Sequence, residues 1–181
     1  MKSKSDLVLR CCLIAAVWSL PGAVFAQQGS PARAKSPLLR AAPASRPSYA
    51  QTTSGLAAAV DFATSKNVSM SCAVIDSAGD LVGFTRMDRA EAITRDIAEA
   101  KARTSVTFGQ PSGDVEKKMG PVFSKLNQLL GNRMVALAGG LPIVADNQII
   151  GAIACSGAMG PGNLDEAAGR AAIAAMGLSE Q

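Results

Sequence analysis

The feature that most constrains the fold is a pair of strand–turn–strand units. In the first, residues 68–75 alternate larger side chains (Met70, Cys72, Val74) with small ones, and a turn at 76–80 leads into a second strand at 81–87. In the second, the apolar runs 141–145 and 148–156 are separated by Asp146 and Asn147, which favour a tight hairpin turn. Because hairpins pair successive strands antiparallel, the chain is expected to form a mainly antiparallel sheet.

Helical spacing of apolar residues surrounds these hairpins. It predicts a helix beginning near Gln51, others over 92–108, 114–119 and 121–130, and a last helix that Asn163 and Glu166 cap as a capping box. A further apolar run at 133–138 predicts another strand. Apolar residues make up 48% of the chain but aromatic ones only 4%, so Ala, Val, Ile and Leu must form the core. The expected class is α+β, with helices packed on the sheet.

The N-terminus has the three parts of a secretory signal peptide. Lys2, Lys4 and Arg10 precede an apolar run over 11–24 that is too short to span a bilayer, and Ala26 ends a cleavage site. Residues 1–26 are therefore predicted to be removed, which places the protein in the periplasm or outside the cell. Residues 27–50, rich in Ala, Pro, Ser and Arg, are predicted to be a flexible linker, and residues 51–181 the folded domain.

The chain contains no histidine. This excludes a Ser-His-Asp or Cys-His catalytic relay, a histidine-ligated zinc site and a haem held by a proximal imidazole. Residues 51–181 hold 11 basic and 13 acidic side chains, so a nucleic-acid partner is not expected. No spacing of residues demands catalysis, and a binding protein is favoured over an enzyme.

Four segments, taken in order, carry a family resemblance: 74–88, 96–104, 138–143 and 150–157. Together they resemble the GlcG/HbpS-like haem-binding family, which includes the C-terminal domain of PduO-type corrinoid enzymes. The resemblance covers about residues 51–178. It implies a profilin-like fold with a five-stranded antiparallel sheet, assembly into homo-oligomers, and binding of haem or a related tetrapyrrole in haem or iron handling or redox sensing.

The same resemblance implies a haem site on the helix predicted over 92–108. Thr104 matches a threonine that faces the iron in the family, and Lys101 and Arg103 are placed to pair with the propionates. A solvated helix face would explain the same residues. Met87 offers a thioether as an alternative axial ligand, as do Met134 and Met159, although methionine more often fills gaps in a core.

A second hypothesis is an enzyme or accessory protein that binds small organic acids. The glycine-rich segment 156–163 precedes a helix, where backbone N–H groups bind anions. The candidate residues for a carboxylate are Arg86, Asp76, Gly157, Gly160 and Asn163. An ordinary strand-to-helix loop is the favoured explanation of the segment, and the anion site is the alternative. A third hypothesis is a scaffold that acts only through protein partners.

Cys72 and Cys155 are the cysteines that remain after signal removal. They lie in the first and last predicted strands, which are neighbours in the family's sheet. Export permits a disulfide between them, and two buried free thiols are equally ordinary.

Overall fold

The computed structural model describes residues 45–158, 160 and 162–180. The predicted signal peptide, most of the predicted linker and Met159 lie outside the described residues. The elements, in chain order, are α1 (Tyr49–Ser65), β1 (Ser71–Asp76), β2 (Leu81–Arg86), α2 (Ile93–Phe108), α3 (Ser112–Met119), α4 (Pro121–Leu129), β3 (Gly140–Ala145), β4 (Gln148–Ser156) and α5 (Leu164–Ala175).

The strands form one antiparallel sheet in the order β2-β1-β4-β3. The α+β class and the antiparallel sheet are therefore confirmed. The prediction of five strands is wrong: the sheet of the described residues has four. Among the same residues, none of the helices has the length and apolar run needed to cross a bilayer.

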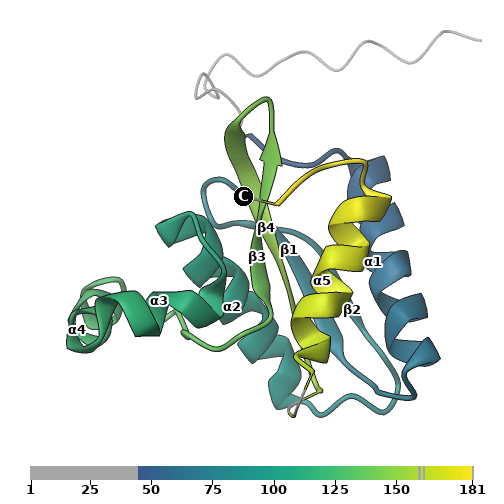
Figure 1. Ribbon diagram of the computed structural model, residues 1–181, viewed down its shortest axis with the longest axis horizontal. Coiled ribbons are helices and arrows are strands. Elements are labelled where there is room, and N and C mark those ends of the chain that lie inside the picture. Colours follow the sequence, from purple (N-terminus) through teal and green to yellow (C-terminus); the bar gives the residue numbers. More distant parts are fainter. Residues whose placement is uncertain (1–44, 159, 161, 181) are drawn as a thin grey trace, which may run out of the picture. The chain divides into compact units, whose positions relative to one another are not determined.

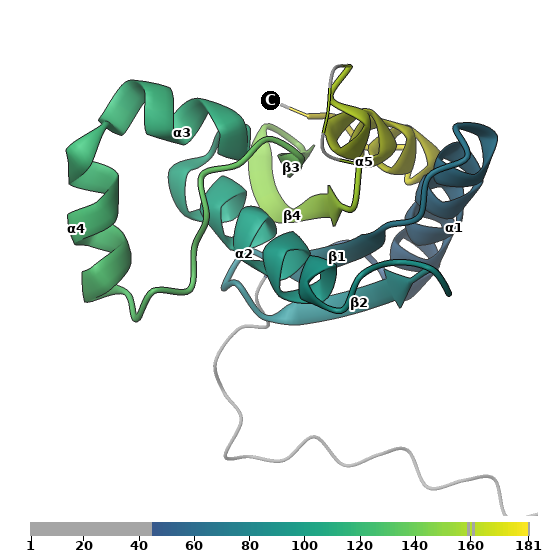
Figure 2. The same ribbon diagram turned by 90° about the horizontal axis from the view of Figure 1, so that it is seen from below.

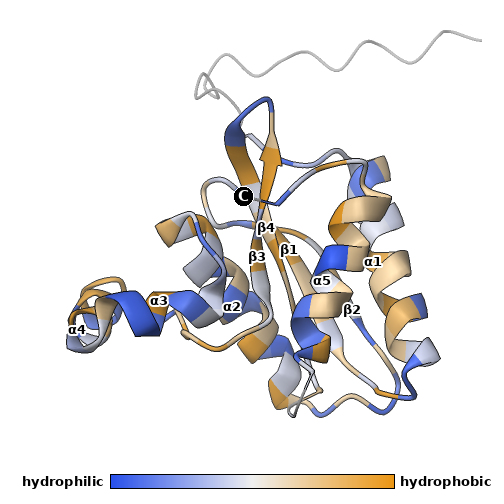
Figure 3. Cartoon of the chain, in the orientation of Figure 1, coloured by the Kyte–Doolittle hydropathy of each residue, from blue (hydrophilic) through white to orange (hydrophobic). Residues whose placement is uncertain are grey.

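Helices cover both faces of the sheet, as Figures 1 and 2 show. α1 and α5 pack on one face, around a core that includes Val74, Leu141 and Ile153. α2 packs on the other face, where Ile75 and Ala102 meet the alanines of β4. Because β1 is covered on both faces, all six of its residues are buried. The apolar colouring of the central strands in Figure 3 follows from this position.

The segment predicted as a fifth strand, 133–138, is not a strand: residues 133–137 have no regular secondary structure, Ala138 lies in a turn, and the segment pairs with none of the described strands. Its backbone groups are bound by side chains of helices instead. Thr104 binds the backbone N–H and C=O of Val135, and Asn127 binds those of Met134. Since these groups are already satisfied, they do not extend the sheet. Residues 133–137 are called the strap below.

The two ends of the fold also differ from prediction. α1 begins at Tyr49, with Ser48 as its cap and the side chain of Gln51 completing a capping box. Residues 49 and 50, expected in the linker, thus belong to the helix. At α5 the predicted capping box is wrong. Asn163 has a left-handed backbone, its side chain makes no cap bond, and its amide donates to Glu166.

Candidate functional site

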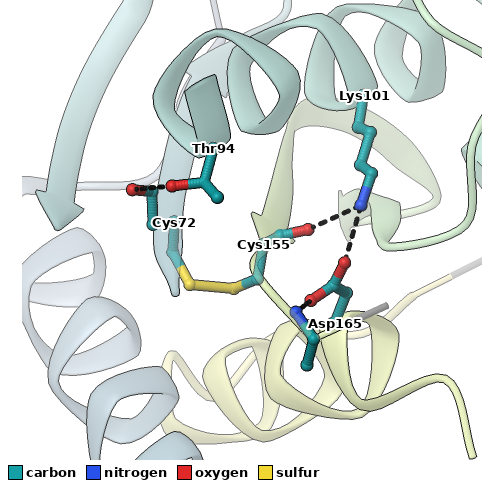
Figure 4. The surroundings of a disulfide bond; sticks show 7 residues. Cys72, Thr94, Lys101, Cys155 and Asp165 are labelled. Carbon is teal, nitrogen blue, oxygen red and sulfur yellow. Dashed lines mark hydrogen bonds and ion pairs between the residues drawn. A yellow bond between two sulfur atoms is a disulfide. The ribbon is translucent and has the colours of Figure 1, made fainter. Parts of the chain in front are cut away.

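A disulfide joins β1 to β4 at the centre of the sheet (Figure 4). Cys72 and Cys155 are direct cross-strand partners, their Cα atoms are 4.1 Å apart, and both residues are fully buried. They lie in the core under α1 and α5. The sequence left bonded and free cysteines equally open, and in the structure they are bonded.

A buried ion pair lies beside this disulfide (Figure 4). Lys101 on α2 is 3% exposed, and its Nζ donates to Asp165 Oδ2 at 2.8 Å and to the Cys155 carbonyl at 3.1 Å. The other oxygen of Asp165 accepts from the backbone N–H of Ala158. A side chain on Gly139, whose φ is +124°, would meet Lys101 Nζ at 2.9 Å. The ammonium group is therefore committed to the protein interior and ties α2 to the start of α5.

Thr104 has a different position from the one that the resemblance implies. Its side chain is fully buried. The hydroxyl lies 2.9 Å from the carbonyl oxygens of Ala100 and Val135, and it accepts from the backbone N–H of Val135 at 3.0 Å. One hydroxyl has one proton and two lone pairs, so this set of contacts occupies it. No side of Thr104 is open to a ligand.

Arg103, which lies between Lys101 and Thr104 in the sequence, is at a groove on the outer side of α2. It is half-buried, and its Nη2 donates to Glu99 at 3.1 Å. Its Nε is buried and has no hydrogen-bond partner within the described part of the chain. Burying an unpartnered donor costs free energy, so this N–H is a ready donor for a bound acceptor.

Two adjoining grooves share Arg103, Arg133 and Met134. One, of about 380 Å³, lies between α2 and the start of the strap, and Asp96 and Glu99 are among the residues that line it. The other, of about 260 Å³, reaches the β1–β2 turn at 77–80. Within the described residues, Asp96 is paired with Arg95 and Glu99 with Arg103, whereas Arg133 takes part in no ion pair.

The sequence matches a known family over most of this fold. Residues 48–174 match the family described as "Haem degrading protein HbpS-like". The chain belongs to the HbpS-like family. Among curated relatives, this HbpS-like chain is 33% identical to "Protein GlcG" of Escherichia coli (strain K12) over 101 residues, which are 56% of this chain and 74% of that protein.

Solved structures of similar fold agree with this membership. The "Crystal Structure of HbpS" has a TM-score of 0.65 at 27% identity, covering 75% of this chain and 93% of the other. The "Crystal Structure of PduOC:Heme Complex" has a TM-score of 0.67 at 24% identity, covering 74% and 97%. The second likeness shows the fold alone.

The remaining predicted residues of this HbpS-like chain are not gathered at one place. Met87 follows β2 and lines a separate groove of about 230 Å³ with Asp88 and Arg89. Arg86, at one end of β2, donates two hydrogen bonds to the Ala90 carbonyl. Asp76, at the opposite end of the same strand pair, accepts from the backbone of the 76–80 turn.

The glycine-rich loop lies at the Arg86 end of the sheet, because Ser156 and Arg86 both pair with Ser71. A side chain on Gly157 would meet the Ser69 carbonyl oxygen at 2.4 Å, so this residue serves close backbone packing. Gly160 and Asn163 both have positive φ values. The set predicted for a small organic acid is therefore divided between two ends of the sheet, with Asp76 apart from the rest.

Three residues of the site and its surroundings were missed from the sequence: Arg133, Asn127 and Asp165. Arg133 belongs to the run interpreted as a strand, and Asn127 is a polar residue in an otherwise ordinary amphipathic helix. Asp165 pairs with a lysine 64 residues away. No local sequence pattern indicates a contact at that separation. An acidic residue in the first turn of a helix is common because it interacts favourably with the helix dipole, so Asp165 did not stand out.

Proposed function

We propose that this protein binds haem or a related tetrapyrrole in the two grooves that meet at Arg103, and that it does so outside the cytoplasm. The observation that carries the proposal is the pair of guanidinium groups, Arg103 and Arg133, shared by adjoining grooves. Guanidinium groups bind carboxylates through paired, charge-assisted hydrogen bonds, and haem carries two propionates. Membership of the HbpS-like family supports the choice of a tetrapyrrole over other dianions.

The residues present also offer a ligand for iron. Met134 lines both grooves, and a thioether is an established axial ligand of haem. Its backbone is held by Asn127 through two hydrogen bonds, at 2.9 and 3.0 Å. Bound haem would supply redox-active iron at this surface. Among the described residues that line the grooves, Met134 has the side chain, a thioether, that would suit this iron as a ligand.

Hemin titration of the mature protein, followed at the Soret band, tests the proposal. Saturable binding is expected, and Arg103→Ala and Arg133→Ala are each expected to raise Kd about tenfold or more, the effect of losing a charged hydrogen bond. Arg170→Ala is the matched control, because Arg170 also pairs with a glutamate four residues before it but lies on α5. No saturable Soret change, or an equal loss of affinity in the control, refutes the proposed site.

A time course with a reductant extends the same experiment. The family is described as haem degrading, so the Soret band of the loaded protein is followed in the presence of ascorbate and oxygen. A stable band indicates a carrier or sensor, and its protein-dependent loss indicates turnover. Both outcomes require binding at the Arg103 grooves, and the Arg103→Ala variant connects either one to that site.

Export is supported by the disulfide as well as by the N-terminal sequence. Structural disulfides persist in oxidising compartments and are rare in the cytosol. The fully buried Cys72–Cys155 bond is therefore what an exported protein would retain. This agrees with the predicted cleavage after Ala26 and with a periplasmic or secreted protein.

Assembly with further copies of the chain is the last part of the proposal. None of the residues of α4 is buried, and the helix contacts α3 rather than the sheet; Figure 2 shows it standing away from the strands. Its stripe of large apolar side chains includes Val122 (52% exposed), Leu129 (80%) and the following Leu130 (50%). An apolar helix face left in water is typical of a protein–protein interface. The partner proposed for this face is a second copy of the chain.

A further inference from the structure

The strap is fixed to the domain by side chains from three helices. Thr104 of α2 binds both backbone groups of Val135, and Asn127 of α4 binds both backbone groups of Met134. Ser112 of α3 donates to the Leu137 carbonyl and accepts from the Gly140 N–H. The strap therefore keeps its position through a few specific hydrogen bonds and not through a continuous ladder.

The strap in turn carries two of the residues that the proposed site uses. Arg133 and Met134 are its first two residues, and both line the two grooves. Thr104 and Asn127 are attached to the strap within one or two residues of them. A change in either attachment moves the groove wall, although Thr104 itself is fully buried and not among the residues that line the grooves.

We infer that Thr104 and Asn127 are positioning residues, which hold Arg133 and Met134 at the groove wall and affect ligand binding only through the strap. This inference rests on the proposed function for its ligand and on hydrogen bonds alone for the strap. It assigns Thr104 a role that does not include contact with the ligand or its metal. It also makes Asn127, on a different helix, an equal partner in that role.

The burial of Thr104 is the main argument against direct ligation. To reach a bound metal, its hydroxyl would have to give up contacts with Ala100 and with both backbone groups of Val135. Those two backbone groups would then be left without partners beside α2, each at a cost in free energy. Holding the strap uses the hydroxyl as it already lies.

Four variants separate the two roles. Thr104→Val keeps the shape and removes the hydroxyl, Thr104→Ser keeps the hydroxyl, and Asn127→Ala releases the other attachment. Thr64→Val is the matched control, because Thr64 also donates to the carbonyl four residues before it but lies on α1, away from the strap. Far-UV circular dichroism establishes that each variant is folded, and Asn127→Ala, which alters a half-buried residue, serves if Thr104→Val fails this test.

Hydrogen exchange in the ligand-free protein gives the first readout. Thr104→Val is expected to speed exchange of the Val135 amide about tenfold, the effect of one lost hydrogen bond, and Asn127→Ala to do the same for Met134. Thr104→Ser and Thr64→Val are expected to leave both amides close to wild type. Unchanged exchange in both Thr104→Val and Asn127→Ala overturns the inference.

Hemin binding gives the second readout. Thr104→Val and Asn127→Ala are each expected to weaken hemin binding about tenfold. The Soret position and the electron paramagnetic resonance spectrum of the saturated complex are expected to stay as in wild type. A changed spectrum in Thr104→Val, without one in Asn127→Ala, shows direct ligation and overturns the inference. If wild type takes up no hemin, the proposed function fails and the ligand role assigned to the strap fails with it, whereas faster exchange in the variants still shows that the strap is held as described.

Discussion

Removing the Cys72–Cys155 disulfide perturbs the domain at its centre, and the cost can be worked out from its place in the chain. The bond closes a loop of 83 residues. The chain-entropy relation for a loop of that length gives roughly 4.5 kcal/mol of stabilisation at 25 °C, by restricting the unfolded chain. Since natural domains are stable by about 5–15 kcal/mol, the double variant C72A/C155A is expected to lose a large share of its unfolding free energy.

Urea unfolding of oxidised wild type and of C72A/C155A, followed by far-UV circular dichroism, measures this loss. Both sulfur atoms are in a fully buried core, so the variant also loses packing worth about 1 kcal/mol per removed group. Loop closure and packing together predict a melting temperature lower by roughly 20–25 °C for a domain of this size. Wild type reduced in denaturant and returned to buffer with reductant should unfold earlier too, and reductant should leave C72A/C155A unchanged.

Two results would refute the reasoning. One is a loss of less than about 1 kcal/mol in C72A/C155A, which would mean that the loop closure contributes little against residual structure in the unfolded chain. The other is full reduction of wild type, verified by thiol titration, with no change in the urea midpoint. Either result would also weaken the use of this bond as support for export.

Further predictions concern the Lys101–Asp165 ion pair, helix α4, small organic acids and the predicted signal peptide. Lys101→Met should cost about 3–5 kcal/mol in urea unfolding, because it leaves the Asp165 carboxylate buried and unpaired, and adding Asp165→Asn should restore part of that loss; equal stability of the single and double variants would contradict this. Leu129→Glu should lower the mass found by light scattering without changing the circular dichroism spectrum, and an unchanged mass would exclude α4 from the assembly. Small hydroxy and keto acids should leave the melting temperature flat, since the residues predicted for them are divided in the fold, and a rise with one of them would restore that hypothesis. N-terminal sequencing of the exported protein should give Gln27 as the first residue, and an intact signal peptide would contradict cleavage.

The elements with a regular period were predictable from the sequence. Both hairpins and the helix over 92–108 were found because alternation and helical spacing repeat along the segment. The strap was misread for the same reason, since residues 133–138 form a short apolar run like a strand. What decides its structure is a threonine 31 residues before Val135 and an asparagine seven residues before Met134. Such side-chain contacts leave no periodic mark in the sequence.

The start of α5 shows a second limit of sequence reasoning. Asn163 and Glu166 have the spacing of a capping box, but the box requires an extended backbone at the cap residue. Here Asn163 has φ +47° and ψ +49°, and it follows Gly162, also at positive φ. Its side chain therefore bonds Glu166 and not the helix backbone. The residue types were correct for a cap, and the loop that precedes them decided against it.

Helix geometry explains why only one of the three predicted α2 residues lies at the groove. At about 100° per residue, Arg103 lies about 200° around the helix from Lys101, whereas Thr104 lies only about 60° from it. Lys101 and Thr104 share the buried side of α2 with Ala98, Ala102 and Ser105. A ligand on the outer side of α2 can therefore meet Arg103 without meeting the other two. A loss of binding in a Thr104 variant must then pass through the strap, and this is why the spectrum of the bound state, more than the affinity, identifies what Thr104 does.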